Sequence, residues 1–110
     1  MSEDEIRRIM LDLPNNFNEE KLEGISGTIQ IQFSGEGTSN WILVFKEQMC
    51  NVSEGFAENP DLTLRTDAGI GAKIFTGESD PMRAYMLGKL RVSGDLSLGM
   101  KITKLLSSGS

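Results

Sequence analysis

The spacing of apolar and polar residues predicts a mixture of strands and helices. An apolar residue every three or four positions predicts a first helix, capped by Ser2 and ended by Pro14. From residue 28 the period changes to two, which is typical of a half-buried strand. By these criteria we expect strands over residues 28–33, 40–46, 49–54, 61–66 and 89–93, and further helices over residues 19–22, 68–76, 81–87 and 96–106. This order predicts an α+β fold with a five-stranded, mostly antiparallel sheet covered by helices.

The second predicted strand is apolar on both faces. Trp41, Leu43 and Phe45 alternate with Ile42 and Val44. A strand of this kind is typical of a sheet that is covered on both sides, so we expect cover on both faces here.

The last predicted helix also has two apolar faces. Its main stripe consists of Leu98, Ile102, Leu105 and Leu106. Leu96 and Met100 lie nearly opposite this stripe, although a surface helix needs only one apolar face. The second face either meets a partner, a membrane or a bound apolar molecule, or it wraps round into the core. The sequence leaves both interpretations open.

Composition excludes several classes of function. The chain has 110 residues, one cysteine and no histidine, and its formal net charge is −5. We interpret residues 1–110 as one domain. Without histidine there is no Ser-His or Cys-His catalytic centre and no imidazole ligand, so we expect no enzyme, no metal and no cofactor. The acidic balance argues against a nucleic-acid partner, and Cys50 is expected to be a small buried apolar residue.

The ends of the sequence predict a cytoplasmic protein. Residues 1–5 lack the basic and apolar regions of a signal peptide. The longest uninterrupted apolar run covers residues 41–45, far short of the roughly 20 residues that span a bilayer. The Ser/Gly tail, residues 107–110, differs from the peroxisomal Ser-Lys-Leu address.

Charge is divided unevenly between the two halves of the sequence. Residues 1–60 contain eleven acidic and four basic side chains, whereas residues 61–110 contain five acidic and seven basic ones. A cationic half beside an apolar opening suits an anionic head group or a transient contact with an anionic membrane surface. The candidates for holding a carboxylate or phosphate are Lys73, Arg83, Lys89, Lys101 and Lys104. A solvated surface is the alternative interpretation of the same charges.

Several short stretches, in order and spacing, resemble the sterol carrier protein family. They are residues 27–35, Asn40-Trp41, Glu54-Gly55, residues 59–64, residues 86–95 and Met100-Lys101. Residues 86–95 are the most specific of these, and the resemblance extends over residues 17–106. It implies a sheet covered by helices that enclose a hydrophobic tunnel, and lipid binding without catalytic residues. Two features depart from the family: the peroxisomal signal is missing, and the segment after Thr66 is poor in bulky apolar residues, which bears on the width of the tunnel.

The hypothesis from the sequence is therefore a non-enzymatic carrier of an apolar lipid, such as a fatty acid, fatty acyl-CoA, isoprenoid or sterol-like ligand. Strand periodicity and the family-like positions of the helix residues give the predicted lining: Phe33, Trp41, Leu43, Phe75, Met82, Met86, Met100 and Leu105. The alternative is an interaction module without a ligand, which dimerises or docks through the apolar face of the C-terminal helix. The oligomeric state is left open.

Overall fold

The computed structural model describes residues 2–107, so Met1 and residues 108–110 of the Ser/Gly tail lie outside the described residues. The chain runs through α1 (Glu3–Asp12), the 3-10 turn η1 (Leu13–Asn16), α2 (Glu19–Leu22), β1 (Gly27–Ser34), β2 (Ser39–Lys46), β3 (Met49–Glu54), β4 (Leu62–Asp67), α3 (Ala68–Phe75), α4 (Pro81–Met86), β5 (Leu90–Gly94) and α5 (Leu96–Ser107). Apart from η1, which the sequence did not predict, these elements match the predicted order, and their bounds differ from the predicted ones by one or two residues.

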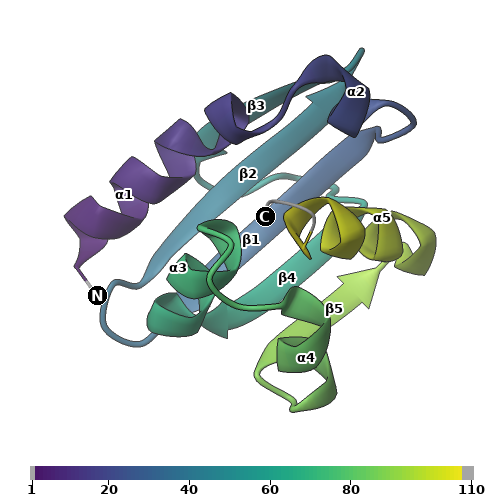
Figure 1. The fold of residues 1–110 in the computed structure, drawn as a ribbon. Coiled ribbons are helices and arrows are strands. Elements are labelled where there is room, and N and C mark those ends of the chain that lie inside the picture. Colours follow the sequence, from purple (N-terminus) through teal and green to yellow (C-terminus); the bar gives the residue numbers. More distant parts are fainter. Residues whose placement is uncertain (1, 108–110) are drawn as a thin grey trace.

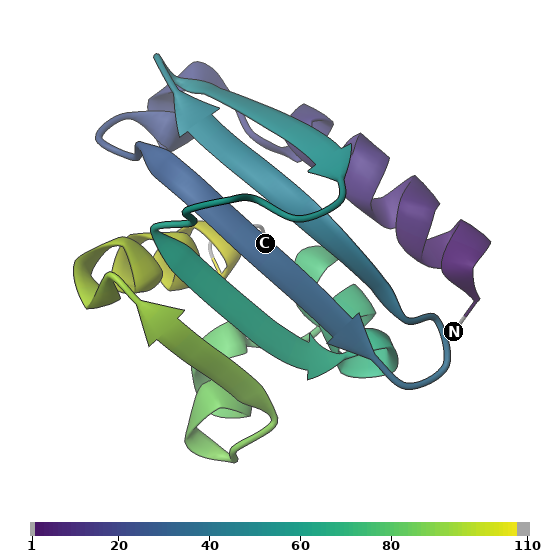
Figure 2. The same cartoon turned by 180° about the vertical axis from the view of Figure 1, so that it is seen from behind.

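The five strands form one sheet in the order β3-β2-β1-β4-β5. β1 and β4 pair in parallel, and the other three neighbouring pairs are antiparallel, so the sheet is mostly antiparallel as predicted. The helices lie on one face of this sheet (Figure 1). Seen from behind, the opposite face carries no helix among the described residues and is crossed by the segment that joins β3 to β4 (Figure 2).

Side-chain caps begin the helices where the sequence predicted them. The Ser2 hydroxyl accepts a hydrogen bond from the Glu5 backbone N–H at 3.2 Å at the start of α1. Asp80 caps α4 in the same way, with Pro81 in the first turn, and Asp95 accepts from the Leu98 N–H at 3.1 Å at the start of α5. Each cap satisfies a backbone donor that the helix itself leaves unpaired.

The hydrophobic core lies between the helices and the sheet. Ile6 and Met10 of α1 and Trp41 of β2 are at most 1% exposed. Under α3, the rings of Phe33 and Phe75 meet edge to face with centroids 5.9 Å apart. The apolar stripe of α5 predicted from the sequence is buried as well.

The face without helices bears on the prediction that both faces of β2 are covered. Ile42 and Val44 point to this face and are only half-buried, so the two-sided apolar pattern of β2 does not indicate a helical layer on each side. Cover comes instead from the β3–β4 segment. The buried Gln30 holds it: its amide nitrogen donates to Gly55 O at 3.0 Å, and its amide oxygen accepts from the Ala57 N–H at 2.7 Å.

Candidate functional site

An apolar groove lies between α4, α5 and the edge strand β5. Its volume is about 220 Å³, and it is lined by Met82, Tyr85, Val92, Leu96, Gly99, Met100 and Thr103. None of these side chains is charged, and the Thr103 hydroxyl donates to the Gly99 carbonyl of its own helix at 2.7 Å. A surface of this composition favours a hydrocarbon over a polar ligand.

The sequence forms this groove because two helices flank an edge strand. α4 has only six residues and ends before Gly88, whose φ of +75° turns the chain into β5. α5 follows β5 at once. Gly99 is the point of close approach: a Cβ there would lie 3.4 Å from Val92 and 3.5 Å from Leu62. α4 and α5 therefore contact each other and β5 (Figure 1), and the groove lies between them.

The second apolar face of α5 opens into this groove. Leu96 is 67% exposed and Met100 is 69% exposed, whereas Leu98 and Ile102 on the opposite stripe are at most 5% exposed. The interpretation in which Leu96 and Met100 wrap into the core is therefore wrong.

An enclosed void lies deeper, between the sheet and the helices. Its volume is only about 10 Å³, which is room for about one water molecule. It is bounded by Ile31, Leu64, Thr66, Ile74, Phe75, Pro81, Leu90, Ile102, Thr103 and Leu106. Thr103 thus lines both the open groove and the void. The expected enclosed tunnel is therefore reduced to this void. A further open hollow of about 210 Å³ lies between η1, α3 and α5, and its lining is partly polar.

The predicted head-group residues divide into two sets. Lys73, Arg83 and Lys89 come together around a hollow of about 440 Å³ on the other side of α4, with Glu78 and Asp80 among its lining residues. The other two residues lie on α5. The Lys101 ammonium donates to the Gly24 carbonyl at 3.0 Å, and Lys104 is exposed.

Within residues 2–107, no helix is both long enough and apolar enough to cross a bilayer.

Comparison with known proteins identifies the family. The model of the SCP-2 sterol transfer family matches residues 9–107. The chain belongs to this family. It is also 34% identical over 95 residues to the hydroxysteroid dehydrogenase-like protein 2 of Xenopus laevis, which covers 86% of this chain but only 23% of that protein. The chain therefore spans about a quarter of the curated relatives that it matches.

Solved structures of sterol carrier proteins share the fold. The palmitated SCP2L2 from Aedes aegypti superposes with a TM-score of 0.76 at 21% identity, covering 96% of this chain and 95% of that one. The sterol carrier protein domain 2 of Helicoverpa armigera gives a TM-score of 0.75 at 23% identity, covering 93% of this chain and 83% of that one. The resemblance and the fold class predicted from the sequence are confirmed.

The predicted lining of this sterol carrier domain is only partly gathered at the groove. Met82 and Met100 line it, and Met86 lies on α4 with 77% of its surface exposed. The other five residues are at most 5% exposed and lie outside the groove: Phe33, Trp41, Leu43, Phe75 and Leu105. Of these, Phe75 and Leu105 border the separate hollow between η1, α3 and α5. Their role in binding stays a prediction.

Four groove residues were not singled out in the sequence: Tyr85, Val92, Gly99 and Thr103. Tyr85 lies three positions from Met82 on α4, so helical spacing could have found it. Thr103 and Gly99 are a small polar residue and a glycine, and nothing in the hydrophobic pattern marks such residues as lining.

Proposed function

We propose that this domain binds an apolar lipid chain in the groove between α4 and α5 and transfers it without catalysis. The observation that carries this is the exposure of Leu96 and Met100 beside an uncharged hollow. Soluble proteins rarely leave contiguous apolar surface exposed without a use for it. Membership of the sterol transfer family supports the same conclusion.

The apolar lining supports a ligand with a hydrocarbon chain. A fatty acid, fatty acyl-CoA or isoprenoid would each bury methylene groups at about 0.8 kcal/mol apiece. A fatty acyl chain has the strongest support, since the related Aedes aegypti protein is described as palmitated.

We expect the hydrocarbon tail of a bound lipid to extend from the groove inward past Thr103. The groove, at about 220 Å³, is smaller than the roughly 300–1,000 Å³ of common ligand pockets. Thr103 separates it from the enclosed void. Separation of α4 from α5 would join the two spaces. The affinity of the domain for fatty acids, measured by titration calorimetry, should then keep rising with chain length from decanoate to palmitate. A plateau after decanoate would mean that the hydrocarbon tail is confined to the groove.

The test of lipid binding compares two identical substitutions. Met100→Glu places a carboxylate in the groove, where a bound tail would strip it of water, so uptake of a fluorescent fatty acid should fall by about tenfold or more. Met49→Glu is the matched control, because Met49 is 58% exposed on β3, outside the groove. Both variants should fold, as checked by circular dichroism. Equal uptake by both variants would overturn the assignment.

Delivery of the lipid involves a brief contact with a membrane surface. Met86 and Leu87 are 77% and 59% exposed at the end of α4, and the cations Arg83 and Lys89 lie beside them. Flotation with anionic vesicles should carry more protein than flotation with neutral vesicles, and added salt should abolish the difference. We place this activity in the cytoplasm, as the sequence predicts.

The same exposed surface supports a second candidate, a homodimer that buries α4 and α5 without a ligand. Light scattering after sizing chromatography separates the two functions. A dimer that excludes the fluorescent fatty acid supports dimerisation, and a monomer that binds it supports the carrier. Native mass spectrometry followed by solvent extraction would name any lipid that co-purifies.

A further inference from the structure

The face of the sheet opposite the helices carries a row of polar and cationic side chains. The strand register aligns Asn40 of β2 with Gln32 of β1, Gln32 with Arg65 of β4, and Arg65 with Arg91 of β5. Because side chains alternate along strands, and the neighbours of these residues are buried toward the helices, all four point away from the lipid groove. The row lies near the end of β1, close to the β1–β2 turn, on the face seen in Figure 2.

The two arginines are directly opposite each other on neighbouring strands. Like charges in this arrangement are unfavourable. Among the described residues, no ion pair is formed by either guanidinium. Arg65 is instead held by Gln32, whose amide oxygen accepts from the Arg65 Nε at 3.0 Å. That bond fixes the side chain and leaves the terminal nitrogens of Arg65 available as donors.

The row lines a hollow rather than a flat surface. This hollow has a volume of about 430 Å³, and its wall includes a third basic residue, Lys89, which also borders the hollow beside α4. The one carboxylate in the wall, Asp67, already caps α3: it accepts from the Gly69 N–H at 2.8 Å and the Ile70 N–H at 3.3 Å. Three basic residues and one carboxylate, which already accepts hydrogen bonds from α3, give the wall a net positive charge, although the formal net charge of the chain is −5.

We propose that this hollow is an anion site that binds a phosphate group through Arg65 and Arg91. Guanidinium groups form paired hydrogen bonds to phosphate oxygens. A phosphate dianion bound between the two arginines would offset their repulsion, because it attracts both. The amides of Gln32 and Asn40 add donors at the same wall. The phosphate belongs either to a soluble phosphorylated metabolite or to a phospholipid head group. The site is independent of the lipid groove, which lies on the other face.

Titration of the isotope-labelled protein with pyrophosphate, followed by amide chemical shifts, tests the site. At low ionic strength the shifts should saturate and should centre on Gln32, Arg65 and Arg91. Arg65→Gln and Arg91→Gln should each weaken binding by about tenfold. Arg8→Gln is the matched control, because Arg8 is exposed on α1 and loses the same charge; it should keep wild-type affinity. Shifts that do not saturate, or equal weakening in all three variants, would overturn the site.

Two further measurements keep the result clear of misfolding and identify the source of the phosphate. Without an anion, Arg91→Gln should melt at or above the wild-type temperature because it relieves the repulsion. Pyrophosphate should raise the melting temperature of Arg91→Gln by less than it raises that of the wild type. An equal rise in both proteins would count against the site. Monomeric dihexanoyl phosphatidic acid distinguishes the two sources of the phosphate. Binding tighter than that of pyrophosphate points to a lipid head group, and weaker binding points to a soluble metabolite. In either case, loss of this binding in Arg91→Gln supports the site.

Discussion

The helical layer has a filled half under α1 and α3 and an open half between α4 and α5. In the filled half, Ile6, Met10 and Trp41 are at most 1% exposed. In the open half, Leu96 and Met100 are 67% and 69% exposed, although they are just as apolar. The difference is therefore one of geometry and not of composition: apolar side chains become a site where the elements that carry them fail to cover one another.

The lengths and places of the elements explain this difference. α1 has ten residues with one apolar stripe, and it packs against α3 and the sheet. α4 has six residues beside the edge strand β5, and α5 carries apolar residues on two faces. A short helix at the edge of a sheet leaves such a second face without a neighbour. The predictions below test whether the two halves differ in stability and in function.

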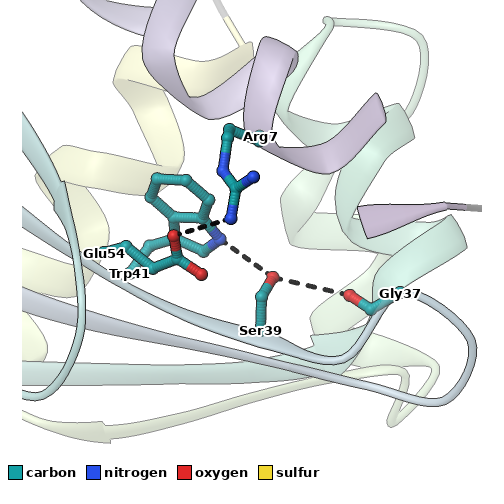
Figure 3. A network of polar contacts seen from close by, with 5 residues as sticks. All are labelled: Arg7, Gly37, Ser39, Trp41 and Glu54. Atoms are coloured by element: carbon teal, nitrogen blue, oxygen red, sulfur yellow. Dashed lines mark hydrogen bonds and ion pairs between the residues drawn. The ribbon is translucent and has the colours of Figure 1, made fainter. Parts of the chain in front are cut away.

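The largest contrast is expected from truncating one large side chain in each half. Trp41→Ala should lower the free energy of unfolding by about 3–5 kcal/mol, because it leaves a cavity. It also removes the indole N–H that donates to the Ser39 hydroxyl at 2.9 Å (Figure 3). Met100→Ala should change stability by less than about 0.5 kcal/mol, because the side chain is already exposed. Urea unfolding measures both, and similar losses would mean that the groove is packed like the core.

A second contrast uses two helical glycines. A Cβ at Gly71 would lie 2.2 Å from the Phe33 ring, so Gly71→Ala must push α3 away from the sheet. We expect a loss of about 1–3 kcal/mol. Gly99→Ala meets only contacts of 3.4 and 3.5 Å and removes a flexible residue from α5. It should be neutral or stabilising by up to about 1 kcal/mol. Thermal unfolding of the two variants distinguishes these outcomes, and a stable Gly71→Ala would show that the filled half can yield.

The glycines also show how far the sequence could predict this fold. Periodicity and caps predicted the elements, since a Ser2 cap or an Asp80-Pro81 start depends on neighbours in the chain. The parallel pairing of β1 with β4 joins residues more than thirty positions apart, and no local pattern encodes it. Gly71 lies in the segment after Thr66, which the sequence marked only as poor in bulky apolar residues. Its contact with Phe33 is what closes the interior there, so the extent of the hollow could not be predicted from composition.

The same limit applies to the site. The two-faced pattern of α5 indicated Leu96 and Met100 correctly as residues outside the main stripe. The apolar strand residues, such as Leu43, carry a pattern that is identical for a packed core and for a tunnel wall. The row of Gln32, Arg65 and Arg91 could not be predicted, because strand register, and not proximity in the sequence, brings these residues together.

A smaller effect is expected in the pH dependence of stability, through a buried cysteine of the filled half. Burial raises the pKa of the Cys50 thiol from 9.0 to about 11. The unfolded chain therefore ionises this thiol first, so its contribution to stability is complete below pH 9 and is lost as the pH rises toward 11. The stability of the wild type minus that of Cys50→Ala, measured by urea unfolding, should decline across this interval. A constant difference would mean that the thiol is solvated.

The smallest effect is expected at the surface of the filled half, where Arg7 and Glu54 form an ion pair at 3.1 Å beside Trp41 (Figure 3). Both side chains are nearly half exposed, at 48% and 46%, so water and salt screen their attraction. A double-mutant cycle with Arg7→Ala and Glu54→Ala should give a coupling of about 0.2–1 kcal/mol that shrinks in high salt. Stability here would then come from the packing of α1 on Trp41 and not from the ion pair above it. A coupling larger than this, and insensitive to salt, would place the pair among the interactions that keep this half closed.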